Sequence, residues 1–275
     1  MNITQQNGYL KIKQNIIFSA QQTFTCGQCF RWQLLPNGHY QGIVRGTAVE
    51  VWDEDGCLCI ACSEQEFHTL WSDYFDCTFD YRAVCEAFAV DAFTTAAANF
   101  GAGIRILNQE PWEALCTFIL SQCNNIPRIT AIVQRLCTGF GQQISADHFA
   151  FPTASVLAAC SPDTLSPLRA GYRAPYLIHA AQAVENGLDL DALRAIPTAE
   201  ARQEIMQLHG VGRKVADCFL LFGLHKLDAF PVDTWMKKAA VYYQGDMIQF
   251  RNSPWAGIYQ QYFFYYTREH FGKKK

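Results

Sequence analysis

The spacing of apolar residues changes near Ser63, and this change limits the chain to folds that separate a sheet from a helical body. Before Ser63, four short segments rich in β-branched and aromatic residues are predicted strands. Turn sequences such as Pro36-Asn37-Gly38 separate them, and the linked hairpin-like segments predict an antiparallel sheet. The predicted strands cover residues 30–35, 39–45, 48–53 and 57–61.

After Ser63 nearly every segment repeats its apolar residues at helical spacing, and the connections between segments are short. The predicted fold class is therefore α+β: an N-terminal antiparallel sheet region followed by a mostly helical body. We expect two packed domains without a flexible linker, residues 1–100 and residues 101–275. The predicted helices cover residues 64–75, 81–100, 112–122, 128–140, 173–186, 199–208, 213–222, 234–243 and 256–270.

Composition excludes several classes of protein. With 275 residues, half of them apolar, and a net charge of −3, the chain is neither disordered nor generally cationic. It shows no secretory signal and no apolar run long enough to span a membrane, so we expect an intracellular protein with no membrane partner. Twelve cysteines without an export signal favour buried thiols. The clusters Cys26-x-x-Cys29 and Cys57-x-Cys59-x-x-Cys62 allow a zinc site, but the usual paired spacings are missing and we predict no metal.

The most informative motif is Leu208-His209-Gly210-Val211-Gly212, which separates two predicted helices. Glycine permits positive φ and leaves no side chain between the backbone and a ligand. The amides of such a turn face outward at the positive end of the next helix, which suits a phosphate oxygen. The motif alone is also compatible with a tight connection between two helices. The residues that follow the motif favour the phosphate interpretation, and we predict that Gly210, Val211 and Gly212 contact the phosphate backbone of a ligand.

The residues that follow the glycine turn and favour a phosphate-containing ligand are Lys214 and Asp233. Lys214 lies in the first turn of the second helix, and Asp233 follows Pro231 as a typical helix N-cap. Together with the glycine turn they resemble the signature of the helix-hairpin-helix (HhH-GPD) DNA glycosylase superfamily. A lysine amine attacks a sugar C1′ only when neutral, and burial and the helix end both favour that form. A nearby carboxylate stabilises the developing positive charge. We predict Lys214 as the nucleophile and Asp233 as the stabilising group; a phosphate contact and a simple cap are the alternatives.

Four segments, residues 25–32, 118–128, 171–174 and 256–264, resemble the 8-oxoguanine DNA glycosylase family, and the likeness covers nearly the whole chain. The resemblance implies that the Gly27 carbonyl accepts the N7 hydrogen that the oxidised base has and guanine lacks. It also implies that Phe264 stacks on the flipped base opposite Cys218, and that Gln260 reads the Watson–Crick edge. Gln260 and Phe264 share a helix face. A turn glycine and a core aromatic helix are the alternatives.

The same resemblance implies a set of residues that hold the duplex open. Asn124 would enter the space left by the flipped nucleotide, and Tyr172 would act as an aromatic wedge. Arg128 and Arg173 would donate to the orphaned cytosine. Cys123 departs from the family, which often has an asparagine there, and this bears on the strictness of cytosine selectivity.

Trp235 is a second departure, because some family members have a histidine near a phosphate at this position. Its indole N–H can donate one hydrogen bond without carrying charge, and we place it at the DNA backbone. The chain lacks the four-cysteine cluster of the iron–sulfur branch. Lys214 sets it apart from the alkyladenine branch, whose members generally lack that lysine.

The resemblance implies base-excision repair: removal of 8-oxoguanine opposite cytosine, then strand nicking through a Schiff base. The expected partner is double-stranded DNA with 8-oxoguanine or an abasic site, bound by a monomer located with the DNA. No organic cofactor is needed; a monovalent cation on the hairpin carbonyls is implied by the superfamily. Two alternatives stay open. One is a glycosylase for another damaged purine, and the other is a non-catalytic binder of bent or damaged DNA that is indifferent to Lys214.

Overall fold

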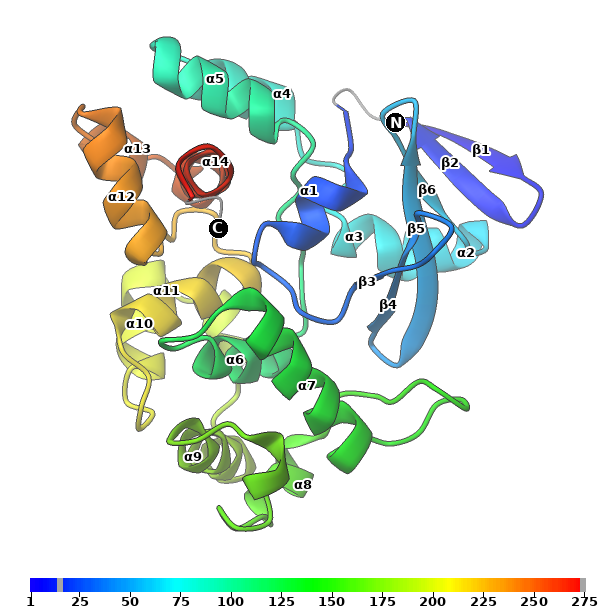
Figure 1. The fold of residues 1–275 in the computed structure, drawn as a ribbon, viewed down its shortest axis with the longest axis vertical. Coiled ribbons are helices and arrows are strands. Elements are labelled where there is room, and N and C mark those ends of the chain that lie inside the picture. The colour runs from blue at the N-terminus through cyan, green and yellow to red at the C-terminus, as the bar shows by residue number, and fades with distance from the viewer. Residues whose placement is uncertain (14–16, 273–275) are drawn as a thin grey trace.

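A computed structural model describes residues 1–13 and 17–272 of the protein. The N-terminal part forms a six-stranded sheet in the order β1-β2-β6-β5-β4-β3. Every neighbouring pair is antiparallel, which confirms the predicted sheet. Figure 1 shows this sheet on the right with α2 and α3 beside it, and most of the other helices on the left. The strands are β1 Asn2–Gln6, β2 Tyr9–Lys13, β3 Gln33–Leu34, β4 Tyr40–Val44, β5 Thr47–Glu54 and β6 Cys57–Ile60.

The turns form where the sequence carries residues that tolerate positive φ. Asp55 and Gly56 connect β5 to β6 with φ of 52° and 71°. The hairpin of β1 and β2 was not among the predicted strands. Ile3 is the one apolar residue in β1, and most of that edge strand is exposed, whereas β2 was missed although Leu10 and Ile12 alternate in it and are buried. Cys57 and Cys59 are buried in β6, which agrees with the expectation of buried thiols.

Fourteen α-helices, with short π and 3₁₀ segments between some of them, make up most of the remaining described structure. Three of them are short pieces near the sheet: α1 Ala20–Thr25, α2 Glu64–Glu66 and α3 Ser72–Tyr74. A π-helical turn at Phe67–Trp71 joins α2 to α3, and 3₁₀ turns lie at Ser166–Leu168 and Ala192–Arg194. The body helices are α4 Tyr81–Phe88, α5 Ala92–Gly101, α6 Pro111–Leu120, α7 Ile126–Phe140, α8 Ala154–Ala158, α9 Arg173–Glu185, α10 Thr198–Ile205, α11 Arg213–Phe222, α12 Thr234–Tyr243, α13 Ile248–Arg251 and α14 Ala256–Phe271.

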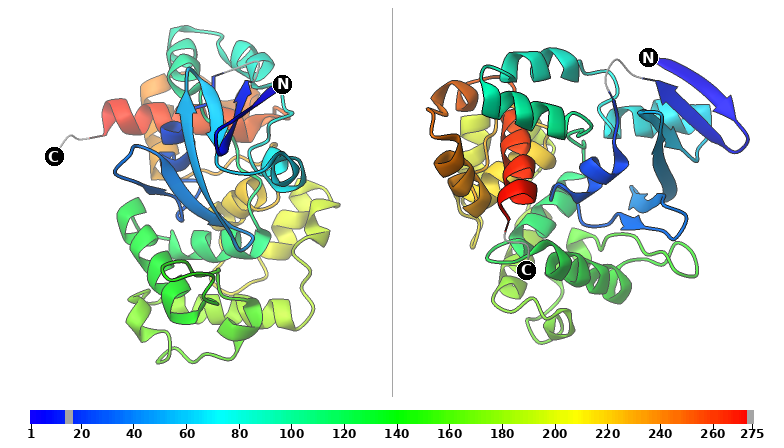
Figure 2. Two further views of the ribbon diagram at one scale, coloured as in Figure 1. Left: turned by 90° about the vertical axis from the view of Figure 1, so that its right-hand side faces the viewer. Right: turned by 45° about the horizontal axis from the view of Figure 1, so that its top comes forward.

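The single helix predicted over residues 81–100 is wrong, because the chain forms two helices there. Helix α4 ends at Phe88, and Asp91 starts α5 with a capping box: its carboxylate accepts from the Thr94 N–H at 2.8 Å. Helix α5 packs along α14, and Figure 2 shows the two side by side.

Two apolar cores lie on either side of the segment that carries Gln28. One core packs the sheet against α1, α3 and the π-helical turn, around Trp71 and Phe75. The larger core fills the helical body and includes Phe88 of α4. The domain boundary at residue 100 stays a prediction, and we propose that α4 and α5 belong with the helical body.

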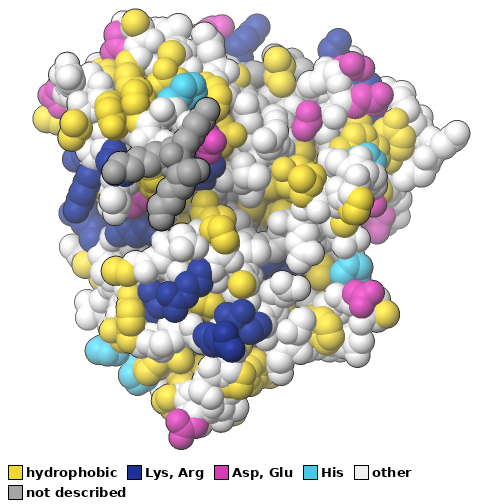
Figure 3. Space-filling view, viewed as in Figure 1, with side chains coloured by type: hydrophobic (Ala, Val, Ile, Leu, Met, Phe, Trp, Pro, Cys, Tyr) yellow, Lys and Arg dark blue, Asp and Glu magenta, His cyan; other side chains and the backbone are white. Residues whose placement is uncertain are grey.

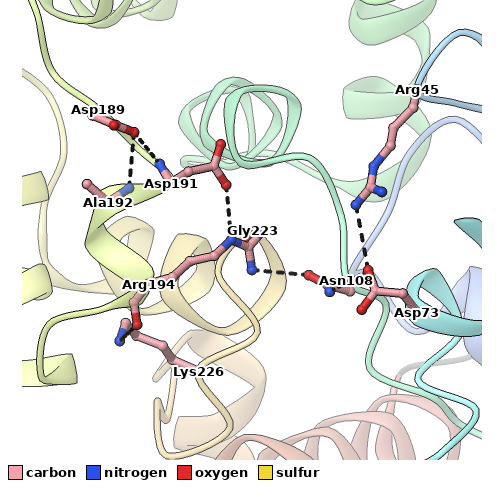
Figure 4. Close-up of polar contacts among 9 residues, drawn as sticks. All are labelled: Arg45, Asp73, Asn108, Asp189, Asp191, Ala192, Arg194, Gly223 and Lys226. Carbon is pink, nitrogen blue, oxygen red and sulfur yellow. Dashed lines mark hydrogen bonds and ion pairs between the residues drawn. The ribbon is translucent and has the colours of Figure 1, made fainter. Parts of the chain in front are cut away.

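Polar contacts also connect the two parts, as Figure 4 shows. The Arg194 guanidinium donates to the Gly223 carbonyl at 2.8 Å and to the Asn108 side-chain oxygen at 3.2 Å. The Asn108 amide then donates to the Asp73 carboxylate at 2.9 Å, and Arg45 lies 3.7 Å from the same carboxylate. This row of contacts runs from the end of α11 to Arg45, in the turn between β4 and β5.

Candidate active site

The turn between α10 and α11 has the hairpin geometry that its glycines predict. Gly210 has φ of +84°, and a Cβ atom there would lie 2.3 Å from the ring of Tyr176. No atom comes within 4 Å of a Cβ built on Gly212, which opens the start of α11 to a ligand. Val211 is buried between them, and its N–H donates to the Leu208 carbonyl at 3.0 Å. The turn therefore has a packed inner side and an open outer side.

An ion pair braces the two helices of this hairpin. Arg202 of α10 lies 2.5 Å from the carboxylate of Asp217 on α11. Burial raises the pKa of Asp217 above its ordinary value, while the guanidinium of Arg202 opposes that shift. The brace keeps the start of α11, and thus Lys214, fixed relative to α10.

Lys214 points from the first turn of α11 toward α6. Its Nζ donates to the Ser121 hydroxyl at 3.0 Å and lies 5.8 Å from the centroid of the Phe118 ring. The side chain is half-buried, so it is shielded yet reachable. Cys218 is one turn further along α11 and is 5% exposed. Burial raises the pKa of the Cys218 thiol to about 11, against an opposing effect from Lys214.

Asp233 caps α12, and its carboxylate accepts from the Met236 N–H at 2.9 Å. The preceding loop brings it to the same cavity as Lys214. One carboxylate oxygen has this cap partner, so the group has a fixed position and its second oxygen can face a ligand. Asp233 therefore acts as a helix cap in the structure. The same residue lines the cavity, so the cap does not exclude a role there.

The cavity has a volume of about 560 Å³, and we call it the base pocket. Gly27 lies at its wall with φ of +86°, and a Cβ atom there would lie 3.6 Å from the Phe264 ring. Gln28, fully buried, holds this segment: its amide donates to the Arg105 carbonyl at 2.7 Å and accepts from the Leu107 N–H at 2.9 Å. The residues that matter for its chemistry are Gly27, Ser121, Lys214, Cys218, Asp233, Gln260, Phe264 and Arg268.

Helix α14 contributes one wall of the base pocket. Gln260 is 3% exposed, and its side-chain oxygen accepts from the Gln261 amide at 2.8 Å. Phe264, one turn later, is 9% exposed. All four residues predicted for base recognition, Gly27, Cys218, Gln260 and Phe264, line this one cavity.

The residues predicted for the opposite base lie around the loop between α6 and α7. We call residues 121–128 with Tyr172 and Arg173 the opposite-base loop. Arg128 is exposed, and Asn124 lines the base pocket while donating to the Leu120 carbonyl at 3.0 Å. Tyr172 is 51% exposed, as a wedge requires. Cys123 has φ of +46° at the bend of the loop.

Arg173, which is predicted to donate to the orphaned cytosine, is 3% exposed in this structure. Its guanidinium donates to the Gln122 carbonyl at 2.8 Å, to the Cys123 carbonyl at 3.1 Å and to the Ala170 carbonyl at 3.1 Å. In this state the side chain holds the opposite-base loop together. Its predicted contact with cytosine stays a prediction, and it requires these bonds to be exchanged.

Trp235 lies in the first turn of α12 and lines the base pocket. Lys238 lies with its Nζ 4.2 Å from the Trp235 ring centroid, so the uncharged indole has a cation beside it. In Figure 3 several Lys and Arg side chains lie close together on the lower half of the viewed face, although the whole chain carries a net charge of −3. Positive charge is therefore local.

Sequence reasoning assigned no role to Ser121 or Arg268, and both line the base pocket. Ser121 carries no signal of its own, because its role depends on where Lys214 points. Arg268 does carry a signal: it continues the spacing of four residues set by Gln260 and Phe264.

Two absences hold for residues 1–13 and 17–272. No group of three His, Cys, Asp or Glu side chains in these residues could hold a metal ion. No helix in the same ranges has the length and apolar character needed to cross a membrane.

Two sequence families match the chain in succession. The family described as 8-oxoguanine DNA glycosylase, N-terminal domain, matches residues 10–115. The HhH-GPD superfamily base excision DNA repair protein family matches residues 116–246. A solved Clostridium acetobutylicum 8-oxoguanine glycosylase/lyase, in complex with double-stranded DNA containing cytosine opposite 8-oxoguanine, is 33% identical. It superimposes with a TM-score of 0.91 over 98% of this chain and 99% of that one.

The chain belongs to the 8-oxoguanine DNA glycosylase family. Another family member, solved as MBOgg1 with a low affinity DNA ligand, is 35% identical with a TM-score of 0.90, and the match covers 99% of both chains. The N-glycosylase/DNA lyase of Saccharomyces cerevisiae is 39% identical over 50% of this chain and 41% of its own length. The N-glycosylase/DNA lyase OGG1 of Arabidopsis thaliana is 30% identical over 80% of this chain and 65% of its own. The chain thus spans less than two thirds of these curated relatives.

Proposed function

We propose that this chain removes 8-oxoguanine opposite cytosine from duplex DNA and nicks the strand at the resulting site. The observation that carries the proposal is that Lys214 and Asp233 line the same cavity as the buried amide of Gln260 and the ring of Phe264. Family relatives named glycosylase/lyase support both activities. The proposed enzyme is a DNA N-glycosylase with lyase activity at abasic sites.

Lys214 acts as the nucleophile. In its neutral form the amine attacks C1′ of the damaged nucleotide, and the Ser121 hydroxyl at 3.0 Å orients it. The aminated sugar then opens to a Schiff base, whose acidic C2′ proton allows β-elimination of the 3′ phosphate. Asp233, fixed by its cap bond to Met236, stabilises the positive charge that develops on the sugar.

The base pocket distinguishes the oxidised base from guanine. The Gly27 carbonyl accepts the N7 hydrogen of 8-oxoguanine but would face a lone pair on guanine, which costs about 1–3 kcal/mol. Phe264 and the Cys218 thiol lie on the two faces of the base, and Gln260 meets its Watson–Crick edge. Burial of Gln260 strengthens this selection, because an amide shielded from water loses more when its partner is wrong.

The rest of the site holds bent duplex DNA. The turn at Gly210 and the open start of α11 at Gly212 bind a phosphate. Val211 lies between them, but its own N–H already donates to the Leu208 carbonyl. Trp235 donates to the backbone on the other side of the pocket. Tyr172 enters the stack beside the lesion, and Asn124, Arg128 and Arg173 face the orphaned cytosine in the opposite-base loop.

The chemistry needs no organic cofactor, because the Schiff base between Lys214 and the sugar itself makes the C2′ proton acidic enough for β-elimination. The superfamily implies a monovalent cation at the hairpin, and the backbone carbonyls of residues 208–212 are the oxygen donors that hard cations take. The cation would help position a phosphate. We place the protein with the DNA of the cell, acting as a monomer.

Borohydride trapping tests this proposal. A duplex with one 8-oxoguanine opposite cytosine should give a covalent adduct with the wild type and none with Lys214→Gln. Lys11→Gln on β2, whose lysine pairs with Glu54 and Asp55 far from the pocket, is the control and should trap normally. An adduct that persists in Lys214→Gln would assign the nucleophile elsewhere.

Parallel duplexes separate the alternatives. Absence of an adduct on 8-oxoguanine together with an adduct on another damaged purine would favour the second glycosylase hypothesis. Tight binding of damaged DNA that is unchanged in Lys214→Gln, with no adduct on any duplex, would favour the non-catalytic binder.

A further inference from the structure

Arg268 is a charged side chain in the base pocket with no assigned role. It lies one turn beyond Phe264 on α14, and its side chain is 16% exposed. The guanidinium carbon lies 5.5 Å from the centroid of the Phe264 ring and 5.3 Å from that of Tyr265. A cation is thus held beside the ring that faces the base.

One of the guanidinium donors is left over. The Nε atom donates to the Glu269 carboxylate at 2.9 Å, and Nη2 lies 2.8 Å from the same oxygen. Nη1 is buried and finds no hydrogen-bond partner among residues 1–13 and 17–272. A buried donor without a partner carries a free-energy cost and calls for an explanation.

Other buried arginines in the protein do not share this arrangement. Arg173 donates to three backbone carbonyls. Arg31 lies 3.0 Å from the buried carboxylate of Glu113. The negative charge of this carboxylate compensates for the burial of the Arg31 guanidinium. Glu269, the partner of Arg268, is 44% exposed, so water screens its charge more than that of the guanidinium. The positive charge of Arg268 at the pocket wall is therefore screened less than the negative charge of its partner.

The reaction of the proposed function, on which this inference rests, produces the charge that such a cation stabilises. Attack by the neutral Lys214 amine forms the C1′–N bond and breaks the bond from C1′ to N9 of the base. The electron pair of the broken bond stays on the base, which leaves as an anion while the lysine nitrogen carries a positive charge. A proton then passes from that nitrogen to the base, and both become neutral.

We propose that Arg268 is a specificity-determining residue of the base pocket, where its guanidinium favours bases that leave as anions and disfavours bases that enter as cations. The favoured class is the neutral, carbonyl-bearing oxidised purines. The disfavoured class is the N-alkylated purines with a fixed positive charge, such as 7-methylguanine. Arg268 acts on charge, whereas Gly27 and Gln260 act on hydrogen-bonding pattern.

Single-turnover excision tests the first half. Arg268→Met should excise 8-oxoguanine opposite cytosine about 10²-fold more slowly than the wild type, the size of effect seen when one preorganised donor to a developing anion is removed. Arg268→Lys should recover most of the loss, because the charge remains. Arg82→Met, an exposed arginine of α4 that pairs with Glu86, is the matched control and should leave the rate unchanged. Thermal unfolding of each variant accompanies the rates.

Equilibrium binding tests the second half without catalysis. In a Lys214→Gln background, duplexes with 2′-fluoro-8-oxoguanosine and 2′-fluoro-7-methylguanosine nucleotides are titrated opposite cytosine. Arg268→Met should reduce the preference for the oxidised base about 10-fold, chiefly by tighter binding of the cationic base. An unchanged preference, or equal losses for both bases, would overturn the proposal. Failure of the wild type to excise 8-oxoguanine would instead contradict the proposed function, so the two failures are distinguishable.

Discussion

The base pocket and the opposite-base loop are built from neighbouring segments, but their side chains are held in different ways. In the pocket, Gln260 and Phe264 are buried on a long helix, and Gly27 is fixed through the buried amide of Gln28. In the loop, Tyr172 and Arg128 are exposed, and Arg173 is committed to the loop's own carbonyls. Under the proposed function, the pocket would receive a base in this conformation, whereas Arg173 would have to exchange its bonds to the loop carbonyls to reach a cytosine. The proposed recognition of the lesion is then preorganised, and the proposed recognition of its partner base forms on binding.

Thiol reactivity gives the largest expected contrast between the two regions. Cys123 of the loop is exposed, and Cys218 of the pocket is buried with a pKa of about 11. Near pH 8 only about a thousandth of Cys218 is thiolate, and shielding slows it further. Iodoacetamide followed by mass spectrometry should label Cys123 at least about 10³-fold faster.

The same measurement carries a pH dependence. Labelling of Cys218 should rise about tenfold for each pH unit between about pH 8 and pH 10, because each unit below its pKa reduces the thiolate tenfold. Rapid labelling of Cys218 near pH 8 would contradict a preformed pocket in which this thiol stays buried.

Asp233→Asn tests whether the pocket's carboxylate acts through charge. Asparagine caps a helix as well as aspartate does, so the bond to the Met236 N–H and the melting temperature should be retained. The rate of 8-oxoguanine excision in single turnovers should fall about 10²-fold, because a neutral amide stabilises a cationic sugar poorly. Asp91→Asn, the cap of α5 on the far side of α14, is the matched control and should leave the rate unchanged. Equal excision rates for Asp233→Asn and Asp91→Asn would show that Asp233 acts only as a helix cap.

Two arginines of the opposite-base loop have different expected roles. Arg173 stabilises the loop, and Arg128 is expected to recognise the opposing base. Arg173→Met should cost about 1–3 kcal/mol of unfolding free energy, because the Gln122 and Cys123 carbonyls lose their donors. Arg128→Met should leave stability unchanged and reduce the preference for cytosine over the other three opposing bases about tenfold. Chemical denaturation and excision from the four duplexes measure the two effects. A stable Arg173→Met protein would show that the loop does not depend on this clamp.

The helical part of the fold could be predicted from sequence where caps and periodicity agree. Helices α11 and α12 have the predicted bounds, 213–222 and 234–243, because Gly212 and Asp233 mark their starts. The break before α5 was missed, since the apolar spacing of residues 81–100 continues across it while Asp91 and Thr94 cap a new helix. Strand β1 has almost no apolar residues and pairs through its backbone, which sequence patterns do not record.

The candidate site shows the same limit at the level of single side chains. The residue types that line the pocket could be inferred, since the resemblance covers their segments. The burial of Arg173 could not, because an arginine next to Tyr172 has the same sequence pattern whether it points outward or turns under the loop. Ser121 acquires its place only through the direction of the Lys214 side chain.

The contact between Gly210 and Tyr176 has a mechanical consequence. Tyr176 lies on α9, the helix that starts at Arg173, and its ring occupies the space where a side chain at Gly210 would be. A side chain larger than glycine at position 210 must therefore displace the Tyr176 ring, and with it the start of α9 beside Tyr172. In the proposed function, damage to the phosphate-binding turn would thus also disturb the wedge, although the two lie on different helices.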